Sequence, residues 1–550
     1  MALAHVQAVI VGAGAGGGVV AKELATAGLR VALLERGKWY SAADCRKDDL
    51  HNQRTTVLGN GFGPEEEGNP RVLVDERGEH VVDPSDAGYS NNAACVGGGT
   101  FSYGAMAWRY MEKDFRMRST YGAVEGSTLD DWPISYHDLA PYYEKAEWEM
   151  GVSGDDANNI FKAPRGKPLP MPPLEPNKEY QVLHPAAQRL GLHPFDIPML
   201  RNTVPYNGRR SCMRCRWCVG FACEVDARTG THNTVIPTAL ATGNCELRTG
   251  CMTREILLDE RGRARGVAYF DANGRLEEQT ADLVIVCGGA VESARLLLNT
   301  RHRWFPNGLG NRYDWVGRNL QSHTYPGAVG LFDFDTFDDL GPGASIAICD
   351  YNHGNPGLAG GGMLANEFIR LPYQFMGLVP PWIPRWGAAH KDFVRTAYKR
   401  TVSVMGPVQE MPLFDSRVQV DAKIKDRWGI PVARLSGRKH PHTLEIARFL
   451  AGKADAWLQE AGAVSTWQRV PGQGLSGGQH QAGTCRMGAD PHTSVVDRDC
   501  RIHDIDNVYV IDASVHVTNG GFNPALTILA NAYRASANLL QAWKGTRVRS

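Results

Sequence analysis

Four cysteines stand close together in "SCMRCRWCVGFAC", at 211–223: Cys212, Cys215, Cys218 and Cys223. Their spacing, C-x2-C-x2-C-x4-C, is near the C-x2-C-x2-C-x3-C-P run of bacterial ferredoxins, with one extra residue and no final proline. Thiolates in such a run could bind an iron–sulfur cluster or a zinc ion, although paired zinc-binding C-x2-C units usually lie further apart. They could also form a structural loop of reduced thiols without metal. The residues alone leave all three interpretations open.

A second chemical pattern opens the chain. Gly12, Gly14 and Gly17 form G-x-G-x-x-G, and Glu35 follows about twenty residues later. In such a motif the first glycine allows a tight turn, the second admits a pyrophosphate to the backbone, and the third lets helix and strand pack closely. The acidic residue can accept hydrogen bonds from a ribose. The pattern predicts dinucleotide binding, without separating FAD from NAD.

The elements around these glycines agree with this prediction. "VQAVIVGAG" and "RVALLERG" are apolar runs typical of buried strands, and "GGGVVAKELATAGL" between them predicts a helix. Together they predict a βαβ unit with parallel strands. Farther on, "DERG" and "DANG" in 235–300 indicate hairpin turns. Residues 40–90 carry few helix or strand signals, and the irregular stretch 336–390 could hold a mobile loop or lid.

Length and composition bound the remaining possibilities. A chain of 550 residues should fold as two or more domains. Its 59 basic and 59 acidic residues balance, so no nucleic-acid surface is expected. No apolar stretch reaches the roughly 20 residues that span a bilayer, and the N-terminus lacks a secretory pattern. We therefore expect a cytoplasmic protein with reduced cysteines, in which a cysteine cluster suggests metal or redox use.

Further motifs occur along the chain in one order. They are the N-terminal glycine pattern, "CVGGGTFSYGAMAWR", "GGAVESARLLLNT", "VGRNLQSH", "HQAGTCRMG" and "VIDASVHVTNGGFNPALTILANAYR". In this order the sequence resembles the glucose–methanol–choline (GMC) family of FAD-dependent alcohol oxidoreductases. The resemblance covers the cofactor-binding part throughout and is weaker in about 120–200 and 325–470.

The resemblance implies an α/β fold with two domains. A Rossmann-like FAD-binding domain with a parallel sheet would comprise 1–160, 205–320 and 480–550. A substrate domain, built on an antiparallel sheet flanked by helices, would comprise 161–204 and 321–479.

The resemblance also implies a set of FAD contacts. Beyond Gly12, Gly14, Gly17 and Glu35, the matching positions are Gly97, Gly98, Gly99, Thr100, Met252, Asp512, Ala513, Asn523 and Thr527. Some relatives attach the flavin to a histidine just after the glycine loop. The matching stretch "TFSYG" has Ser102 and Tyr103 instead, so we expect non-covalent FAD.

Two positions match the family's catalytic pair, His480 and Asn523. A histidine suits the removal of a hydroxyl proton while hydride leaves the carbon for the flavin, because its ordinary pKa lies near working pH. A neutral amide can hold the substrate oxygen by donating a hydrogen bond. We expect neither His492 nor His516 to be the base.

The asparagine, "GTCRMG" and "KDRWGIPVARLS" make the chain most similar to sugar-oxidising members such as bacterial pyranose oxidases and C-glycoside 3-oxidases. This implies oxidation of a secondary hydroxyl of a pyranose or glycoside to a ketone, with dioxygen as acceptor and no metal. The alternative is a gluconate-type dehydrogenase that passes electrons to a quinone or redox protein, with or without an iron–sulfur cluster. Gln321 and Gln409 could hold other hydroxyls, and Trp382 and Trp386 could stack on an aglycone.

Overall fold

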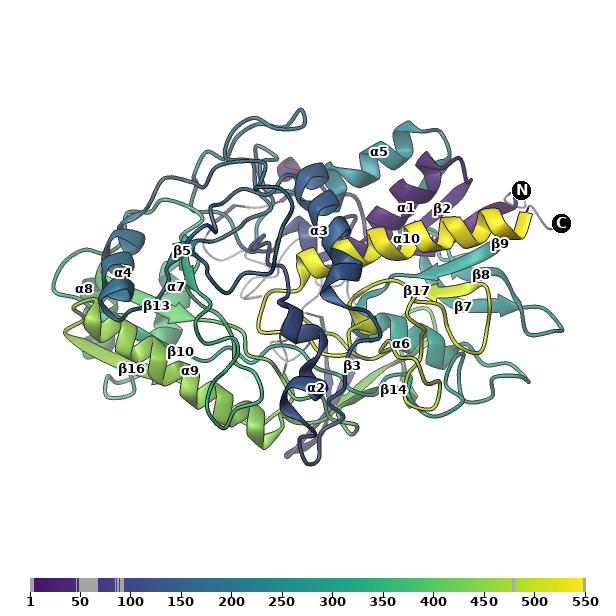
Figure 1. The fold of residues 1–550 in the computed structure, drawn as a ribbon. Coiled ribbons are helices and arrows are strands. Elements are labelled where there is room, and N and C mark those ends of the chain that lie inside the picture. The colour runs from purple at the N-terminus through teal and green to yellow at the C-terminus, as the bar shows by residue number, and fades with distance from the viewer. Residues whose placement is uncertain are drawn as a thin grey trace.

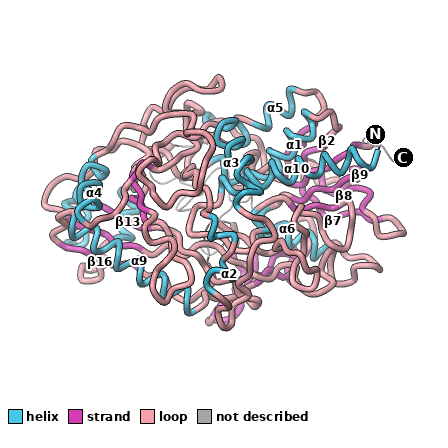
Figure 2. The backbone as a smooth tube through the Cα atoms, in the orientation of Figure 1, coloured by secondary structure: helices cyan, strands magenta, loops and turns pink. Residues whose placement is uncertain are grey.

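The computed structural model describes residues 4–45, 47–48, 68–84, 86, 89, 93–476, 478 and 480–547. Two larger sheets organise these residues, one on each side of the molecule in Figure 1. A third, smaller sheet is formed by segments that lie far apart in the sequence. Long loops connect the elements, as Figure 2 shows.

The first sheet has seven strands in the order β6-β2-β1-β9-β8-β7, and β17 also pairs with β9. Its parallel strands are β1 (Val6–Val11), β2 (Val31–Glu35), β6 (Cys245–Thr249), β9 (Leu276–Val286) and β17 (Val508–Val510). An antiparallel extension adds β7 (Met252–Leu258) and β8 (Ala264–Phe270). The apolar residues of β2 are all buried, as expected for a parallel strand covered on both faces. The βαβ unit and both hairpin turns are confirmed.

Helices cover both faces of this sheet. On one face α1 packs against α5 and α10, and α10 packs against α3, as Figure 1 shows with α10 in yellow. On the other face lies α6, which contacts β7. The helices are α1 (Ala15–Thr26), α3 (Tyr136–Met150), α5 (Val235–Ala241), α6 (Gly289–Asn299) and α10 (Ala525–Arg547). A short helix, α2 (Met117–Tyr121), precedes α3.

The second sheet is antiparallel and has the order β16-β10-β13-β12-β11-β5. Its strands are β5 (Phe195–Asp196), β10 (Gly327–Leu331), β11 (Ile346–Ile348), β12 (Leu364–Asn366), β13 (Thr401–Met405) and β16 (Ser465–Arg469). Helix α9 packs on β10, and α4 packs on α9. The nearby helices are α4 (Lys178–Arg189), α7 (Pro372–Phe375), α8 (Ala388–Ala397) and α9 (Pro441–Glu460). The predicted α/β fold, with a parallel sheet and an antiparallel sheet flanked by helices, is confirmed.

The third sheet joins segments that are far apart in sequence. It has the order β14-β15-β3-β4, in which β15 runs parallel to β3. The strands are β3 (Arg71–Asp75), β4 (Gly78–Val82), β14 (Arg417–Lys425) and β15 (Pro431–Ser436). Helix α6 packs against β14 and β15. The β14–β15 hairpin was assigned by sequence to the substrate domain, but in the structure it contacts β3 and α6, which were assigned to the FAD-binding domain. The exact division into domains stays a prediction.

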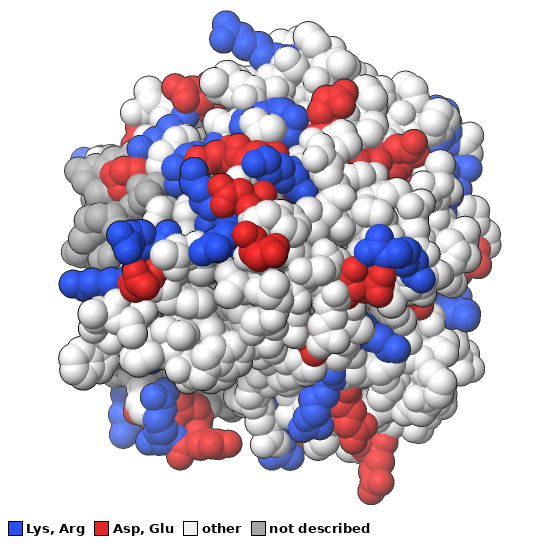
Figure 3. Space-filling view, turned by 90° about the vertical axis from the view of Figure 1, so that its left-hand side faces the viewer, with Lys and Arg blue, Asp and Glu red and all other residues white. Residues whose placement is uncertain are grey.

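The surface carries both signs of charge. Figure 3 shows basic and acidic side chains intermixed on one face, beside a broad area without charged residues. Within the described ranges, none of the helices combines the length and apolar character needed to cross a membrane.

Candidate active site

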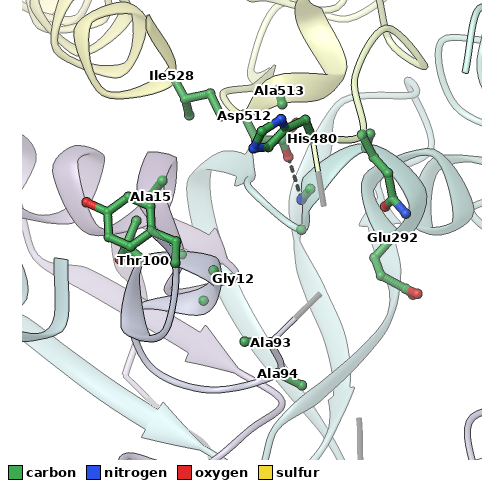
Figure 4. Close-up of a pocket in the computed structure, with 18 of the residues that line it drawn as sticks. Gly12, Ala15, Ala93, Ala94, Thr100, Glu292, His480, Asp512, Ala513 and Ile528 are labelled. Carbon is green, nitrogen blue, oxygen red and sulfur yellow. Dashed lines mark hydrogen bonds between the residues drawn. The ribbon is translucent and has the colours of Figure 1, made fainter. Parts of the chain in front are cut away.

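A cavity of about 650 Å³ lies between the first and second sheets. The first βαβ unit contributes residues to its lining, and so do β12 and β13 of the antiparallel sheet. Figure 4 shows His480, Asp512 and Ala513 on one side of it, with Gly12, Ala15 and Thr100 on another. The cavity therefore connects the predicted dinucleotide site with the predicted catalytic residues.

The three glycines of the N-terminal motif have different surroundings. Gly12 has a φ of +102°, a conformation that side chains rarely adopt. A Cβ on Gly17 would collide with the carbonyl oxygen of Gly12, so this glycine allows α1 to pack on the turn. A Cβ on Gly14 would meet no heavy atom within 4 Å, and Gly14 lines the cavity. Gly98, in the glycine loop Gly97–Gly99, packs against it, because a Cβ there would lie 3.0 Å from the Gly14 Cα.

Glu35 is held at the end of β2 by two backbone donors. Its carboxylate accepts hydrogen bonds of 2.8 Å from the amides of Ala13 and Gly37. Burial raises the pKa of Glu35, and these donors oppose that shift without cancelling it. The side chain lines the cavity, where its free lone pairs could accept from a ribose.

The other predicted cofactor residues divide into two groups. Those that line the cavity are Gly98, Gly99, Thr100, Met252, Asp512, Ala513 and Asn523. Gly17, Gly97 and Thr527 do not line it. Thr527 is fully buried, and its hydroxyl lies 2.7 Å from that of Tyr143. The Asp512 carboxylate accepts from Gly289 N (2.9 Å) and Ser293 Oγ (2.6 Å), which fixes it at the start of α6.

The predicted catalytic residues meet through a tyrosine. Tyr325 Oη lies 3.1 Å from His480 Nδ1, and Asn523 Nδ2 donates to the same hydroxyl at 3.1 Å. All three side chains line the cavity. The Nε1–H of Trp108 donates to Asn523 Oδ1 at 3.0 Å. Since an indole nitrogen can only donate, this contact fixes the oxygen of the amide on the Trp108 side and its NH2 toward Tyr325.

Sequence reasoning did not single out Trp108, His323 or Tyr325. The Nδ1 atoms of His323 and His480 lie 2.8 Å apart. The motif "VGRNLQSH" ends on His323, and Tyr325 follows two residues later, so this motif was the available signal. Trp108 lies in "CVGGGTFSYGAMAWR", the motif that also contains Gly97, Gly98 and Gly99.

The residues suggested for substrate contacts lie elsewhere. Gln321 and Gln409 are buried and are not part of the cavity lining. Gln321 Nε2 donates to Val517 O at 3.2 Å. Neither amide atom of Gln409 has a hydrogen-bond partner among the described residues. Trp382 and Trp386 are 57% and 84% exposed and do not line the cavity either.

The cysteine segment is organised around Arg201. This guanidinium donates to Cys218 Sγ at 2.9 Å and to Cys212 Sγ at 3.5 Å. Burial raises the pKa of the Cys218 thiol, but Arg201 and Arg228 outweigh burial, so the pKa lies below its ordinary value. Across the part of the chain that the structure describes, no three or more His, Cys, Asp or Glu side chains are grouped to hold a metal ion. Whether these cysteines bind a metal stays a prediction.

The cavity fits the predicted FAD. Its lining has open space at Gly14, at the N-terminus of α1, where a phosphate would be favoured. It also has a carboxylate at the end of β2 and continues to His480 and Asn523. A dinucleotide bound along this lining would join the two predicted sites.

Comparisons with known proteins agree with this arrangement. Models of the GMC oxidoreductase family match residues 7–325 and 412–532. The chain is 30% identical to 6'''-hydroxyparomomycin C oxidase of Streptomyces lividus, over 96% of this chain and 90% of that protein. It is 26% identical to the gluconate 2-dehydrogenase flavoprotein of Pantoea cypripedii, over 96% and 93%.

The fold is similar to that of pyridoxine 4-oxidase from Mesorbium loti, with a TM-score of 0.62, 17% identity and 97% and 98% of the two chains covered. The glycine turns, the sheet order and the family matches lead to one conclusion. The chain belongs to the GMC oxidoreductase family, whose members bind FAD and act on hydroxyl-bearing substrates.

Proposed function

We propose that this protein oxidises a secondary hydroxyl of a pyranose sugar or sugar glycoside to a ketone, with dioxygen as acceptor and peroxide as product. The observation that carries the proposal is the set His480, Tyr325 and Asn523, which line one cavity and are linked by two 3.1 Å contacts. An imidazole can take a hydroxyl proton, and an amide can hold the hydroxyl oxygen by donating to it.

The residues divide the work as follows. His480 takes the proton from the substrate hydroxyl, so the O–H bond breaks and an N–H bond forms on the imidazole. Asn523 donates its amide NH2 to the substrate oxygen and keeps that oxygen in register. Trp108 holds the amide in the orientation that this donation needs. When bound, FAD supplies the two-electron acceptor for the hydride that leaves the carbon.

The remaining lining suits a substrate with several hydroxyls. Glu367 and Gln481 are polar, whereas Met363, Phe368 and Met405 are apolar. Polar groups could hold ring hydroxyls, and apolar side chains could cover a face of the ring. We propose Glu367 and Gln481 for hydroxyl contacts, because the lining includes them and omits Gln321 and Gln409. The names of the two relatives, one for an aminoglycoside and one for gluconate, support a sugar-derived substrate.

A dehydrogenase that delivers electrons to a quinone or redox protein is the alternative. The relative named gluconate 2-dehydrogenase favours it. The relative named 6'''-hydroxyparomomycin C oxidase favours the oxidase.

The test is an absorption experiment on purified protein without oxygen. D-Glucose, D-gluconate and paromomycin are added in turn, and the flavin band is followed before and after air is admitted. Bleaching by a pyranose, followed by rapid recovery in air with one peroxide per ketone, supports the oxidase. Bleaching with slow recovery in air but rapid recovery with a quinone supports the dehydrogenase, and an iron assay then decides whether the cysteines hold a cluster. A flavin band that no compound bleaches would refute both.

A further inference from the structure

The imidazole of His323 has one nitrogen whose protonation the structure determines. His323 is 4% exposed, and its Nε2 lies 3.0 Å from Asn519 O and 2.9 Å from Gly520 O. A backbone carbonyl can only accept a hydrogen bond. Nε2 of His323 must therefore carry a proton in every state of this ring.

The protonation of the other nitrogen, Nδ1, follows from the burial of His323. Burial lowers the pKa of His323, and the opposing effects of Glu410 and the two carbonyls do not cancel this. The ring is then neutral near pH 7, so its single proton is on Nε2 and its Nδ1 has a lone pair. His480 Nδ1 lies 2.8 Å from that lone pair. For this contact to be a hydrogen bond, His480 must donate from Nδ1.

We propose that His323 is a positioning residue that fixes the proton of neutral His480 on Nδ1, so that Nε2 of His480 takes the substrate proton. The proposal rests on the function proposed above and names the atom that acts in it. Tyr325 Oη, at 3.1 Å from the same Nδ1, can accept from the same N–H while it accepts from Asn523. In this network Asn523 and His480 both donate to Tyr325. His480 also donates to His323, which donates to the Gly520 carbonyl.

The proton transfer leaves this network intact. The substrate O–H bond breaks, an N–H bond forms at Nε2, and His480 becomes a cation that still donates from Nδ1 to His323. A buried carboxylate is close by, because Glu410 accepts from Ser322 N at 3.1 Å and from Thr324 Oγ1 at 2.6 Å. Its charge acts on the His323 ring and favours a positive charge in this region.

Two variants of His323 separate positioning from folding. His323→Leu removes the acceptor for His480, whereas His323→Asn can present Oδ1 near the place of Nδ1. His390→Leu is the control, because His390 is also buried (9% exposed) and bonds a backbone carbonyl, that of Pro384, in a region outside the cavity. FAD content and thermal unfolding are measured for all three.

The kinetic arm measures flavin bleaching by D-glucose, or by whichever compound of the panel bleaches the wild type fastest. His323→Leu should lower the limiting rate on the order of 10- to 100-fold, as does loss of the group that orients a metal-bound histidine, with the half-saturating concentration unchanged. His323→Asn should recover most of this rate, and His390→Leu should bleach like the wild type. Equal loss in the Leu and Asn variants, or no loss in either, would overturn the proposal.

A second experiment determines the tautomer of His480 by NMR and does not depend on turnover. Two-bond ¹H–¹⁵N correlations of FAD-loaded protein labelled with ¹⁵N-histidine report which ring nitrogen carries the proton, and a His480→Gln spectrum identifies the signal. We expect a proton on Nδ1 of His480 in the wild type and a changed tautomer in His323→Leu. A proton on Nε2 in the wild type would refute the proposal. If no compound bleaches the flavin, the proposed function fails, and this arm alone decides the role of His323.

Discussion

Alanine at Gly14 and alanine at Gly17 should damage the protein in different ways, because the two glycines face different surroundings. Gly14 has φ −82° and ψ −154°, a conformation open to any residue, and a Cβ there meets no heavy atom within 4 Å. A Cβ on Gly17 would overlap the carbonyl oxygen of Gly12 and would lie 3.2 Å from Cys287 Cβ. The first methyl group enters the cavity, and the second enters packed backbone.

The expected magnitudes follow from these surroundings. In Gly14→Ala without FAD, the lower entropy of the unfolded chain stabilises by about 0.4–1 kcal/mol, and a poorer helix N-cap removes a similar amount. Loss of one charge-assisted hydrogen bond to the pyrophosphate costs about 1.5–3 kcal/mol. This corresponds to roughly a 10- to 150-fold rise in the FAD Kd. In Gly17→Ala, overpacking should lower the free energy of unfolding by about 1–3 kcal/mol.

The assay combines denaturant unfolding of the apoprotein with FAD titration followed by flavin fluorescence. Gly452→Ala is the control: it lies in α9, a Cβ there meets nothing within 4 Å, and FAD affinity should not change. Gly14→Ala should lose FAD affinity while the apoprotein keeps wild-type stability. The reasoning would be refuted if Gly14→Ala bound FAD as tightly as the wild type, or if its apoprotein unfolded as easily as that of Gly17→Ala.

Three further predictions concern single side chains. His480→Ala should keep its FAD but slow flavin bleaching by roughly 10²–10⁴-fold in stopped-flow measurements; wild-type bleaching would exclude it as the base. Trp108→Phe should slow bleaching by up to about 10-fold, equivalent to 1.4 kcal/mol, because the Asn523 amide loses the donor that orients it; an unchanged rate would contradict this role. Burial raises the pKa of Glu179 to about 7 although Asn366 donates to it, so the folded protein holds this proton better than the unfolded chain. Its stability should therefore fall as pH rises from about 4.5 to 7, and Glu179→Gln should raise stability at pH 8 by up to roughly 3 kcal/mol with little change at pH 4, as thermal unfolding at both pH values would test.

Local sequence patterns were enough to predict much of the fold. The βαβ unit and the turns at "DERG" and "DANG" depend on neighbouring residues, and the structure contains them. The strands β3 and β4 lie in a stretch with few strand signals, and β11 and β12 have three residues each. Such short strands show no usable period, and their pairing with distant segments stabilises them.

In the candidate site, too, some residues could be predicted from local sequence and others could not. Gly12, Gly14 and Glu35 belong to one continuous motif, so their spacing alone indicated a shared role. The bond from Trp108 to Asn523 spans 415 positions, and only the tertiary fold brings these side chains together. Gln321 and Gln409 were chosen for polarity, which does not distinguish a side chain in the cavity from one buried beside it.

The position of β17 in the first sheet has a consequence for biosynthesis. This strand pairs with β9 in the sheet that β1 begins, although about five hundred residues separate β1 from β17. A nascent chain emerging from the ribosome therefore leaves part of one edge of β9 unpaired until residue 510 has been translated. Such late, long-range pairing folds slowly and leaves the growing chain open to aggregation. Cells that make this enzyme would have to protect the nascent chain, and the cavity that fits FAD would be complete only once Asp512, Ala513 and Asn523 have been made. Recombinant yield should therefore depend on chaperone supply and slow translation.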